Sequence, residues 1–254
     1  MSDPRYLDLF DPAGLRARDA ARQVLETTRP FRTRPDADLE VLDVGCGYAH
    51  TAAALAWTCR QVVGLEPSAI LYNAAVEANG TVPNLELRHC GIESLIERDR
   101  YDVAVLDNVL EHLPDHRLAL EAIARALRPG GVLYLLVPNR LWPLEPHYRL
   151  PFLSYLPLRA ANAYLRLTKR GEDFTDASYA PTYGGLNRLF RERPELEHHY
   201  VLPADLSLAE GGGAWHYRVG AQLIRRVPAL WRISKALLVV AVKRGGAAAA
   251  TASR

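Results

Sequence analysis

Cysteine is scarce in this 254-residue chain, and its placement disfavours two common structural roles. Cys46, Cys59 and Cys90 are an odd number and are widely separated in the sequence. A secreted disulfide framework uses an even set of cysteines, and a zinc site uses closely spaced pairs. We therefore expect free thiols and a reducing, cytoplasmic location.

Long apolar runs and an excess of charge of one sign are also missing. No uncharged apolar stretch approaches the roughly 18 residues that a spanning helix needs, and the N-terminal stretch lacks the apolar core of a signal peptide. The net charge is only +2, and lysine occurs only at 169, 235 and 243 among 31 basic residues. Neither a membrane-spanning segment nor a nucleic-acid surface is expected.

Apolar segments of strand length alternate with amphipathic helical segments over most of the chain. With 49% hydrophobic residues, the chain can bury one sizeable core, and alternation of this kind predicts an α/β fold with a parallel sheet covered by helices on both faces. The predicted strands are 39–44, 61–65, 85–90, 101–107, 132–138, 198–202 and 236–242. The predicted helices are 12–28, 49–58, 68–78 (capped by Ser68), 118–127 (ended by Pro129 and Gly130), 158–169, 184–192 and 220–235.

We expect a single domain over residues 1–244, with a helical cap at 1–37 and a disordered tail at 245–254. The alternation breaks at 140–183, where prolines and aromatic residues accompany one amphipathic helix with basic residues on its outer face. Because this segment follows the fifth strand, we interpret it as a lid that recognises the acceptor. A purely structural excursion, or weak contact with an anionic membrane surface, are the alternatives.

Two glycines and two carboxylates mark a nucleoside site at the carboxyl ends of the first two strands. Gly45 and Gly47 open the turn after the strand that carries Asp43, and the second strand ends on Glu66. Glycines let the backbone approach a ligand, and a carboxylate can accept hydrogen bonds from both ribose hydroxyls. A dinucleotide site usually adds a third glycine where this chain has His50, so a nicotinamide dehydrogenase is disfavoured.

Four blocks in this order resemble the class I S-adenosylmethionine-dependent methyltransferases. They are Asp-Val-Gly-Cys-Gly (43–47), Gly-Leu-Glu-Pro-Ser (64–68), Leu-Asp-Asn-Val-Leu-Glu-His-Leu-Pro-Asp (106–115) and Leu-Arg-Pro-Gly-Gly-Val-Leu (127–133). The segment 137–153 is similar to a subgroup, of methyltransferase type 11/23 character, that acts on small molecules and in glycan pathways. The resemblance implies a Rossmann-like seven-stranded sheet of order 3-2-1-4-5-7-6 with an antiparallel last strand, and S-adenosyl-L-methionine as cofactor.

The resemblance also implies roles for individual residues. Asp43 would take the methionyl ammonium, Glu66 the ribose hydroxyls, and Asn108 would line the cofactor beside the sulfonium. The family usually places an Asp after the third strand to bind the adenine amine, but Gly91 stands there in this chain. The full cofactor-binding prediction is Asp43, Gly45, Cys46, Gly47, Glu66, Pro67, Gly91, Ile92, Asp107, Asn108 and Val109.

Fewer residues are candidates for catalysis or acceptor binding than for cofactor binding. His112 is the candidate general base, because imidazole titrates in the right range, although a structural pairing with Glu111 is an alternative. His147, Tyr148 and Tyr183 are candidate acceptor-binding residues, and Tyr6 is a candidate to close over the cofactor. No metal site is expected, since His198, His199 and His216 lack metal-ligand spacing.

We therefore expect a methyltransferase, monomeric or homodimeric, acting on oxygen or nitrogen of a small molecule. A sugar, glycolipid or polysaccharide-pathway intermediate is the leading acceptor class, and a secondary metabolite is the alternative. A cofactor-binding partner without catalysis is an alternative of another kind.

Overall fold

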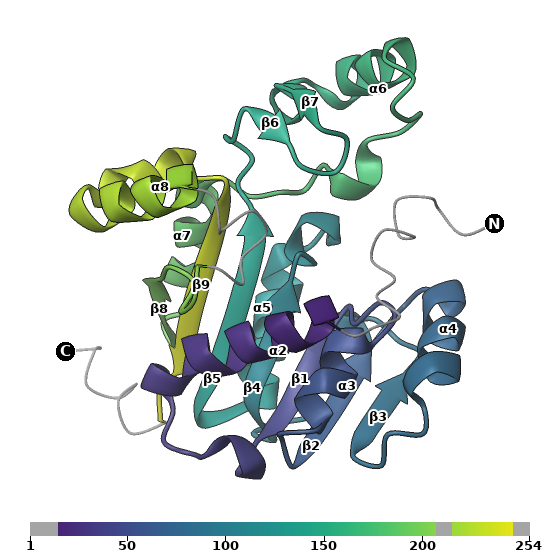
Figure 1. The fold of residues 1–254 in the computed structure, drawn as a ribbon, viewed down its shortest axis with the longest axis vertical. Helices are drawn as coiled ribbons and strands as arrows, with labels where there is room; N and C mark the ends of the chain where they lie inside the picture. The colour runs from purple at the N-terminus through teal and green to yellow at the C-terminus, as the bar shows by residue number, and fades with distance from the viewer. Residues whose placement is uncertain (1–14, 207–214, 246–254) are drawn as a thin grey trace.

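The computed structural model describes residues 15–206 and 215–245, and these build one seven-stranded sheet (Figure 1). The strand order is β3-β2-β1-β4-β5-β9-β8, with a separate two-stranded sheet β6-β7. Because β6 and β7 lie in the insertion after β5, the main sheet follows the expected order 3-2-1-4-5-7-6. The strands are β1 (Glu40–Val44), β2 (Gln61–Leu65), β3 (Leu85–Arg88), β4 (Tyr101–Asp107), β5 (Leu127–Pro138), β8 (Leu196–Tyr200) and β9 (Ala236–Lys243).

The alternation of side chains along the strands separates two apolar layers. One face packs with α2 (Leu15–Thr28), α3 (His50–Ala56) and α4 (Ala69–Asn79), and carries Val41, Val103 and Tyr134. The other face packs with α5 (His116–Ala126) and α7 (Tyr183–Arg191), and carries Leu42, Ala104 and Leu133. Neighbouring residues on each strand thus enter opposite layers, as the period of two requires. Figure 1 shows α2 and α3 in front of the strands.

Strand β9 is buried within the sheet, as its uninterrupted apolar sequence predicts. It pairs antiparallel with β5 on one side and with β8 on the other, and residues 237–241 are buried. The last strand is therefore antiparallel and internal, which confirms the expected fold class.

Two predicted helix ends are wrong, one because of strand pairing and the other because of a proline. Helix α5 ends at Ala126, before Pro129, because Leu127 already pairs with Tyr101 of β4 and the strand then passes an irregularity to reach Val132. The helix expected at 220–235 is instead α8 (Trp215–Arg226) followed by the 3-10 helix η7 (Pro228–Ile233). Proline lacks an amide hydrogen and forces the preceding residue, Val227, out of the helical region.

Other boundaries differ by a few residues. Strand β3 ends at Arg88, so Cys90 follows the strand by two residues, and β8 begins and ends two residues earlier than expected. Ser68 caps α4 as predicted, accepting a hydrogen bond from the amide of Leu71. Tyr6, most of the expected tail and the start of the N-terminal cap lie outside the described residues.

The insertion between β5 and α7 forms a lobe with a small core of its own. It contains β6 (Leu144–Glu145), β7 (Leu150–Pro151), η5 (Leu153–Tyr155), α6 (Leu158–Leu167) and η6 (Thr175–Ala177). Its apolar cluster is made by Tyr148, Leu150, Leu153, Ala161, Leu165, Phe174 and Ala177. Figure 1 shows this lobe projecting beyond the carboxyl end of β5, the end at which parallel α/β sheets bind ligands.

Candidate active site

The turn after β1 brings backbone amides to the carboxyl edge of the sheet. Gly45 and Gly47 have φ angles of 67° and 55°, the left-handed region that glycine adopts without strain. A side chain at Gly45 would also lie 2.8 Å from Val109, so the turn after β1 and the turn after β4 are in contact. The amide of Cys46 donates to the carbonyl of Leu65 at 2.9 Å, which fixes the turn against β2.

Glu66 follows β2 and ties that turn to the start of α4. Its carboxylate is 5% exposed and accepts hydrogen bonds from the amides of Gly47 at 2.9 Å and Ser68 at 2.8 Å. The backbone therefore holds this carboxylate at the strand end, beside the glycine turn. This is the position from which a carboxylate can reach ribose hydroxyls.

Asp43 lies one residue before the end of β1 and is 5% exposed. Its burial, reinforced by the carboxylates of Asp107 and Glu66, raises its pKa to about 8. A ligand cation at this edge would compensate the buried charge. The methionyl ammonium that the resemblance assigns to Asp43 is such a cation.

The turn after β4 adds a third carboxyl group. Burial raises the pKa of Asp107 to about 6, while a hydrogen bond from the Asn108 amide at 2.8 Å opposes this shift. Asn108 has a φ of 54°, a left-handed conformation that asparagine tolerates better than most residues. This turn directs the chain so that Val109 reaches Gly45.

The loop after β3 places another carboxylate beside Gly91, the position where an aspartate was expected. Ile92 is buried, and Glu93 folds back so that its Cδ lies 2.6 Å from where a Gly91 Cβ would be. A carboxylate thus occupies the space of the absent side chain, supplied by a residue two positions later. In the sequence, the only signal for Glu93 is its proximity to Gly91, so it was not predicted.

A cluster of acidic and imidazole groups forms where the insertion meets the turn after β4. Glu111 and His112 lie on the 3-10 helix η4 (Leu110–His112), and His147 comes from the insertion. The Nε2 atoms of both imidazoles lie 4.0 Å from the Glu111 carboxylate. Glu145, 2% exposed, accepts from His147 Nδ1 at 2.7 Å and from the Tyr148 amide at 2.7 Å.

Glu111 is the most deeply buried group of this cluster. Its residue is 0% exposed, and burial raises its pKa to about 7 against the opposing effect of the two histidines. The amide of Tyr179, at the end of the insertion, donates to the Glu111 carbonyl at 3.2 Å. The structure therefore brings the predicted residues His112 and His147 together around Glu111, which the sequence offered only as a structural partner of His112. Glu145, which binds His147, was not predicted.

The remaining predicted residues make the following contacts. Tyr148 is buried in the insertion core, where its hydroxyl donates to the Asp173 carbonyl at 2.8 Å. Tyr183 begins α7 and packs against Tyr200, with ring centroids 4.6 Å apart. Burial raises the pKa of the Cys46 thiol, and Pro67 is exposed with its carbonyl 3.1 Å from the His89 ring.

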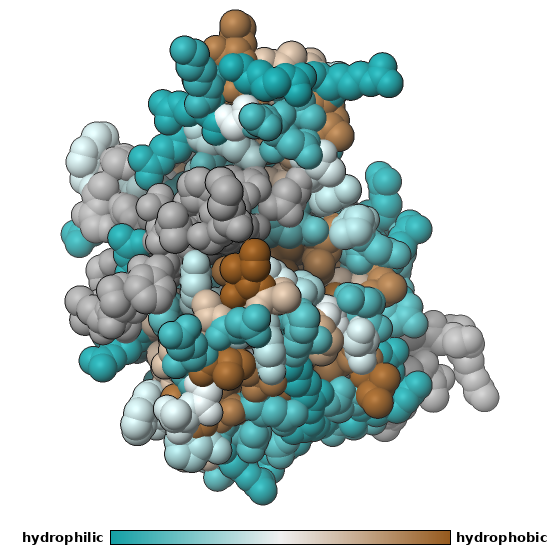
Figure 2. All heavy atoms as spheres, turned by 90° about the vertical axis from the view of Figure 1, so that its right-hand side faces the viewer, coloured by the Kyte–Doolittle hydropathy of each residue, from teal (hydrophilic) through white to brown (hydrophobic). Residues whose placement is uncertain are grey.

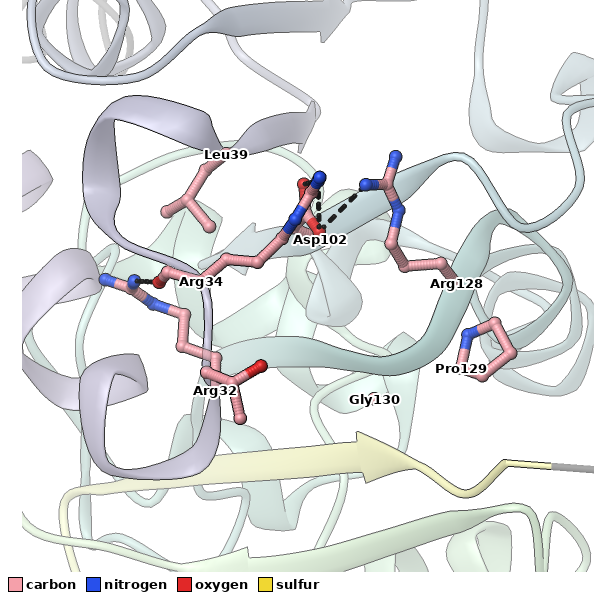
Figure 3. Close-up of a pocket in the computed structure, with 8 residues that line it drawn as sticks. Arg32, Arg34, Leu39, Asp102, Arg128, Pro129 and Gly130 are labelled. Carbon is pink, nitrogen blue, oxygen red and sulfur yellow. Dashed lines mark hydrogen bonds and ion pairs between the residues drawn. The ribbon is translucent and has the colours of Figure 1, made fainter.

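A pocket of about 360 Å³ opens at the opposite edge of the sheet (Figure 3). Arg34 and Arg128 both bind the carboxylate of Asp102, which also accepts from the Glu40 amide at 2.9 Å. These residues precede or begin strands, so the pocket lies at the amino ends. Its charges are paired with one another, and the ligand edge of a parallel sheet is the other one.

Together the fold and the residues at the carboxyl edge define an α/β protein that binds an adenosyl cofactor. A family model described as a methyltransferase domain matches residues 16–225. The chain belongs to this family: it is a class I methyltransferase, and S-adenosyl-L-methionine is its cofactor. None of the described helices is long and apolar enough to cross a bilayer.

Relatives agree on the class of reaction and differ in acceptor. A trans-aconitate 2-methyltransferase of Azoarcus sp. is 31% identical over 150 residues, 58% of this chain and 54% of that protein. A ubiquinone biosynthesis O-methyltransferase of Nitrobacter winogradskyi is 33% identical over 107 residues, 42% of this chain and 41% of that protein. The matches thus span about half of each relative or less.

The fold is also that of solved methyltransferases. The plantazolicin methyltransferase BpumL, solved with a monoazolic desmethylPZN analog and SAH, superposes with a TM-score of 0.60 at 16% identity. The superposition covers 94% of this chain and 88% of that one. At this identity the likeness shows the fold alone.

Replacing Glu66 tests the ribose contact. We expect Glu66→Ala to weaken binding of S-adenosylhomocysteine by about 1.5–3 kcal/mol, because hydrogen bonds to a charged group are lost. Glu77→Ala, at an exposed position on α4, is the matched control and should bind normally. Titration calorimetry measures both, and unchanged affinity in a folded Glu66→Ala variant would refute the contact.

The raised pKa of Asp43 predicts a pH-dependent stability. Between about 4, the pKa of Asp in an unfolded chain, and about 8, the folded chain retains a proton that the unfolded chain releases. Stability without cofactor should therefore fall as the pH rises through this window, and Asp43→Asn should remove that contribution. Urea unfolding at pH 5 and pH 8 measures it.

The exposed Asp38→Asn substitution is the control for this experiment. We expect Asp43→Asn to gain stability relative to the natural chain at pH 8 more than at pH 5, while Asp38→Asn follows the natural chain. An equal pH dependence in all three proteins would contradict the assignment of the raised pKa to Asp43.

Proposed function

We propose that this methyltransferase transfers a methyl group to oxygen or nitrogen of a small molecule, with oxygen favoured. A sugar, glycolipid or polysaccharide-pathway intermediate is the leading acceptor, and a secondary metabolite is the alternative. The observation that carries the proposal is that the buried acids at the ends of β1 and β2 and the polar groups of the insertion share one edge of the sheet. Relatives named for O-methylation and for trans-aconitate support oxygen.

Each carboxylate would hold a different part of the cofactor. Glu66 would accept from the ribose hydroxyls, and Asp43 would bind the ammonium group, with the amides of the Gly45–Gly47 turn beside it. When bound, S-adenosylmethionine supplies an electrophilic methyl group on a sulfonium. The chain then has to align the acceptor and exclude water, which can supply much of the rate.

Adenine would be recognised by Glu93 in place of the family's usual aspartate. Its carboxylate lies in the space that a side chain at Gly91 would fill. A carboxylate accepts hydrogen bonds from an exocyclic amine, and Ile92, buried beside it, supplies an apolar surface. With Glu93 in this role, the glycine at position 91 is compatible with adenine binding.

The insertion would bind the acceptor. Exposed aromatic side chains at Phe152 and Tyr155 can contact rings, and exposed arginines at 149 and 159 can bind anionic groups. Figure 2 shows hydrophobic and hydrophilic residues side by side on the surface of this lobe. The likeness of segment 137–153 to glycan-pathway enzymes favours a sugar.

His112 is the candidate to accept a proton from the acceptor hydroxyl. Weak contact of the basic face of α6 with an anionic membrane also stays a prediction.

The role of Glu93 can be tested with a cofactor product that lacks the adenine amine. We expect Glu93→Ala to weaken S-adenosylhomocysteine about tenfold, the loss of one charged hydrogen bond. Binding of S-inosylhomocysteine, which has an oxygen in place of the amine, should change little. The exposed Glu77→Ala is the control, and an equal loss for both ligands would contradict a contact with the amine.

The proposed reaction is tested by release of S-adenosylhomocysteine from S-adenosylmethionine across an acceptor panel. We expect turnover with hydroxylated sugars or glycolipids and none with the Asp43→Asn variant. Turnover confined to phenols, carboxylates or natural-product scaffolds would refute the sugar class and retain methyl transfer. No turnover with any member would contradict the proposed function.

A further inference from the structure

The Glu111 carboxylate is buried, and its hydrogen-bonding capacity is not used within the described residues. Its residue is 0% exposed, and neither of its oxygens has a hydrogen-bond partner among the described residues. Buried polar groups in folded proteins are nearly always paired, so an exception calls for an explanation such as an ion. Two imidazole Nε2 atoms lie 4.0 Å away, too far for a direct hydrogen bond.

The tautomer of His147 means that this ring does not supply the missing hydrogen bond to Glu111. Glu145 lies 2.7 Å from Nδ1 of His147, and a carboxylate at this distance holds a hydrogen on that nitrogen. The lone pair of a neutral ring then lies on Nε2, which faces Glu111. A lone pair of the Glu111 carboxylate and the lone pair of the His147 ring thus converge, and neither atom can donate a hydrogen bond to the other.

From this convergence we propose that Glu111, His112 and His147 bind a divalent transition-metal ion of the zinc type. One ligand atom from each residue lies within 4.8 Å of the other two. A cation between them needs each atom to move by less than about 1 Å to form bonds of about 2.0–2.2 Å. Two imidazoles and one carboxylate suit zinc and its neighbours, whereas magnesium prefers oxygen ligands.

The surroundings fit such a centre. Glu145 and the Nδ1 of His147 form the carboxylate–histidine pair that commonly orients a metal-bound imidazole. Three protein ligands leave a coordination position for a further ligand, as in sites where the metal acts on a substrate. A cation here would lower the pKa of an acceptor hydroxyl bound to it. In that case His112 acts as a metal ligand and not as the general base. This last step rests on the proposed function, but the metal site does not.

The test is stoichiometric zinc binding by the chelator-stripped full chain, in competition with a chromogenic chelator. We expect one Zn²⁺ per chain, and a loss of affinity of at least about tenfold for His147→Ala and for Glu111→Gln. Glu145→Gln should lose about 10- to 100-fold through the orienting contact. His199→Ala, at an exposed histidine elsewhere, should bind as the natural chain does.

Cobalt and magnesium sharpen the outcome. Co²⁺ should give a visible absorption band that His147→Ala loses, and Mg²⁺ should not compete with zinc. Absence of stoichiometric zinc binding, or equal binding by the His147→Ala, Glu111→Gln and His199→Ala variants, would overturn the site. Urea unfolding without metal checks that the variants fold. Because no methyl donor is present, failure here is distinct from failure of methyl transfer.

Discussion

Burial of acidic groups along one edge of the sheet is the constraint on which the rest of this site depends. Asp43 is buried with Asp107 and Glu66 as its charged neighbours. Like charges removed from water raise the free energy of the folded state until protons, hydrogen bonds or cations compensate them. Two backbone amides compensate Glu66, whereas Asp43 and Glu111 have raised pKa values. The edge is thus built to accept positively charged groups.

The insertion completes this edge without sharing the main core. Its own apolar cluster supports it, while a few polar contacts attach it to the body. Asn139 donates to the carbonyls of Trp231 and Arg232, and Tyr179 donates to Glu111 at the other end. The surface of this lobe can therefore change without repacking the sheet. This separation suits a family whose relatives share a cofactor and differ in acceptor.

Periodicity predicted the sheet well, because each strand enters two apolar layers whose alternation is visible in the sequence. It predicted helix ends less well. Leu127 fits the helical period but belongs to β5, because it pairs with Tyr101 of β4. The residues of the proposed cofactor edge could be predicted from the sequence because they follow strands directly. The contact between Glu111 and His147 could not be predicted, because it depends on how a segment without regular periodicity folds back onto η4. Likewise the fold-back of Glu93 onto Gly91 depends on a side-chain conformation.

The position of the acids also limits what they can contribute to the rate. Methyl transfer from a sulfonium removes positive charge from the reacting centre, so a carboxylate that stabilised the sulfonium would favour the ground state over the transition state. Asp43 and Glu66 are useful to the reaction if they bind the ammonium and the ribose, whose charges do not change. Activation of the acceptor then falls to groups beyond the β4 turn. On the proposed function, Glu111 and His112, joined there by His147 from the insertion, would be these groups.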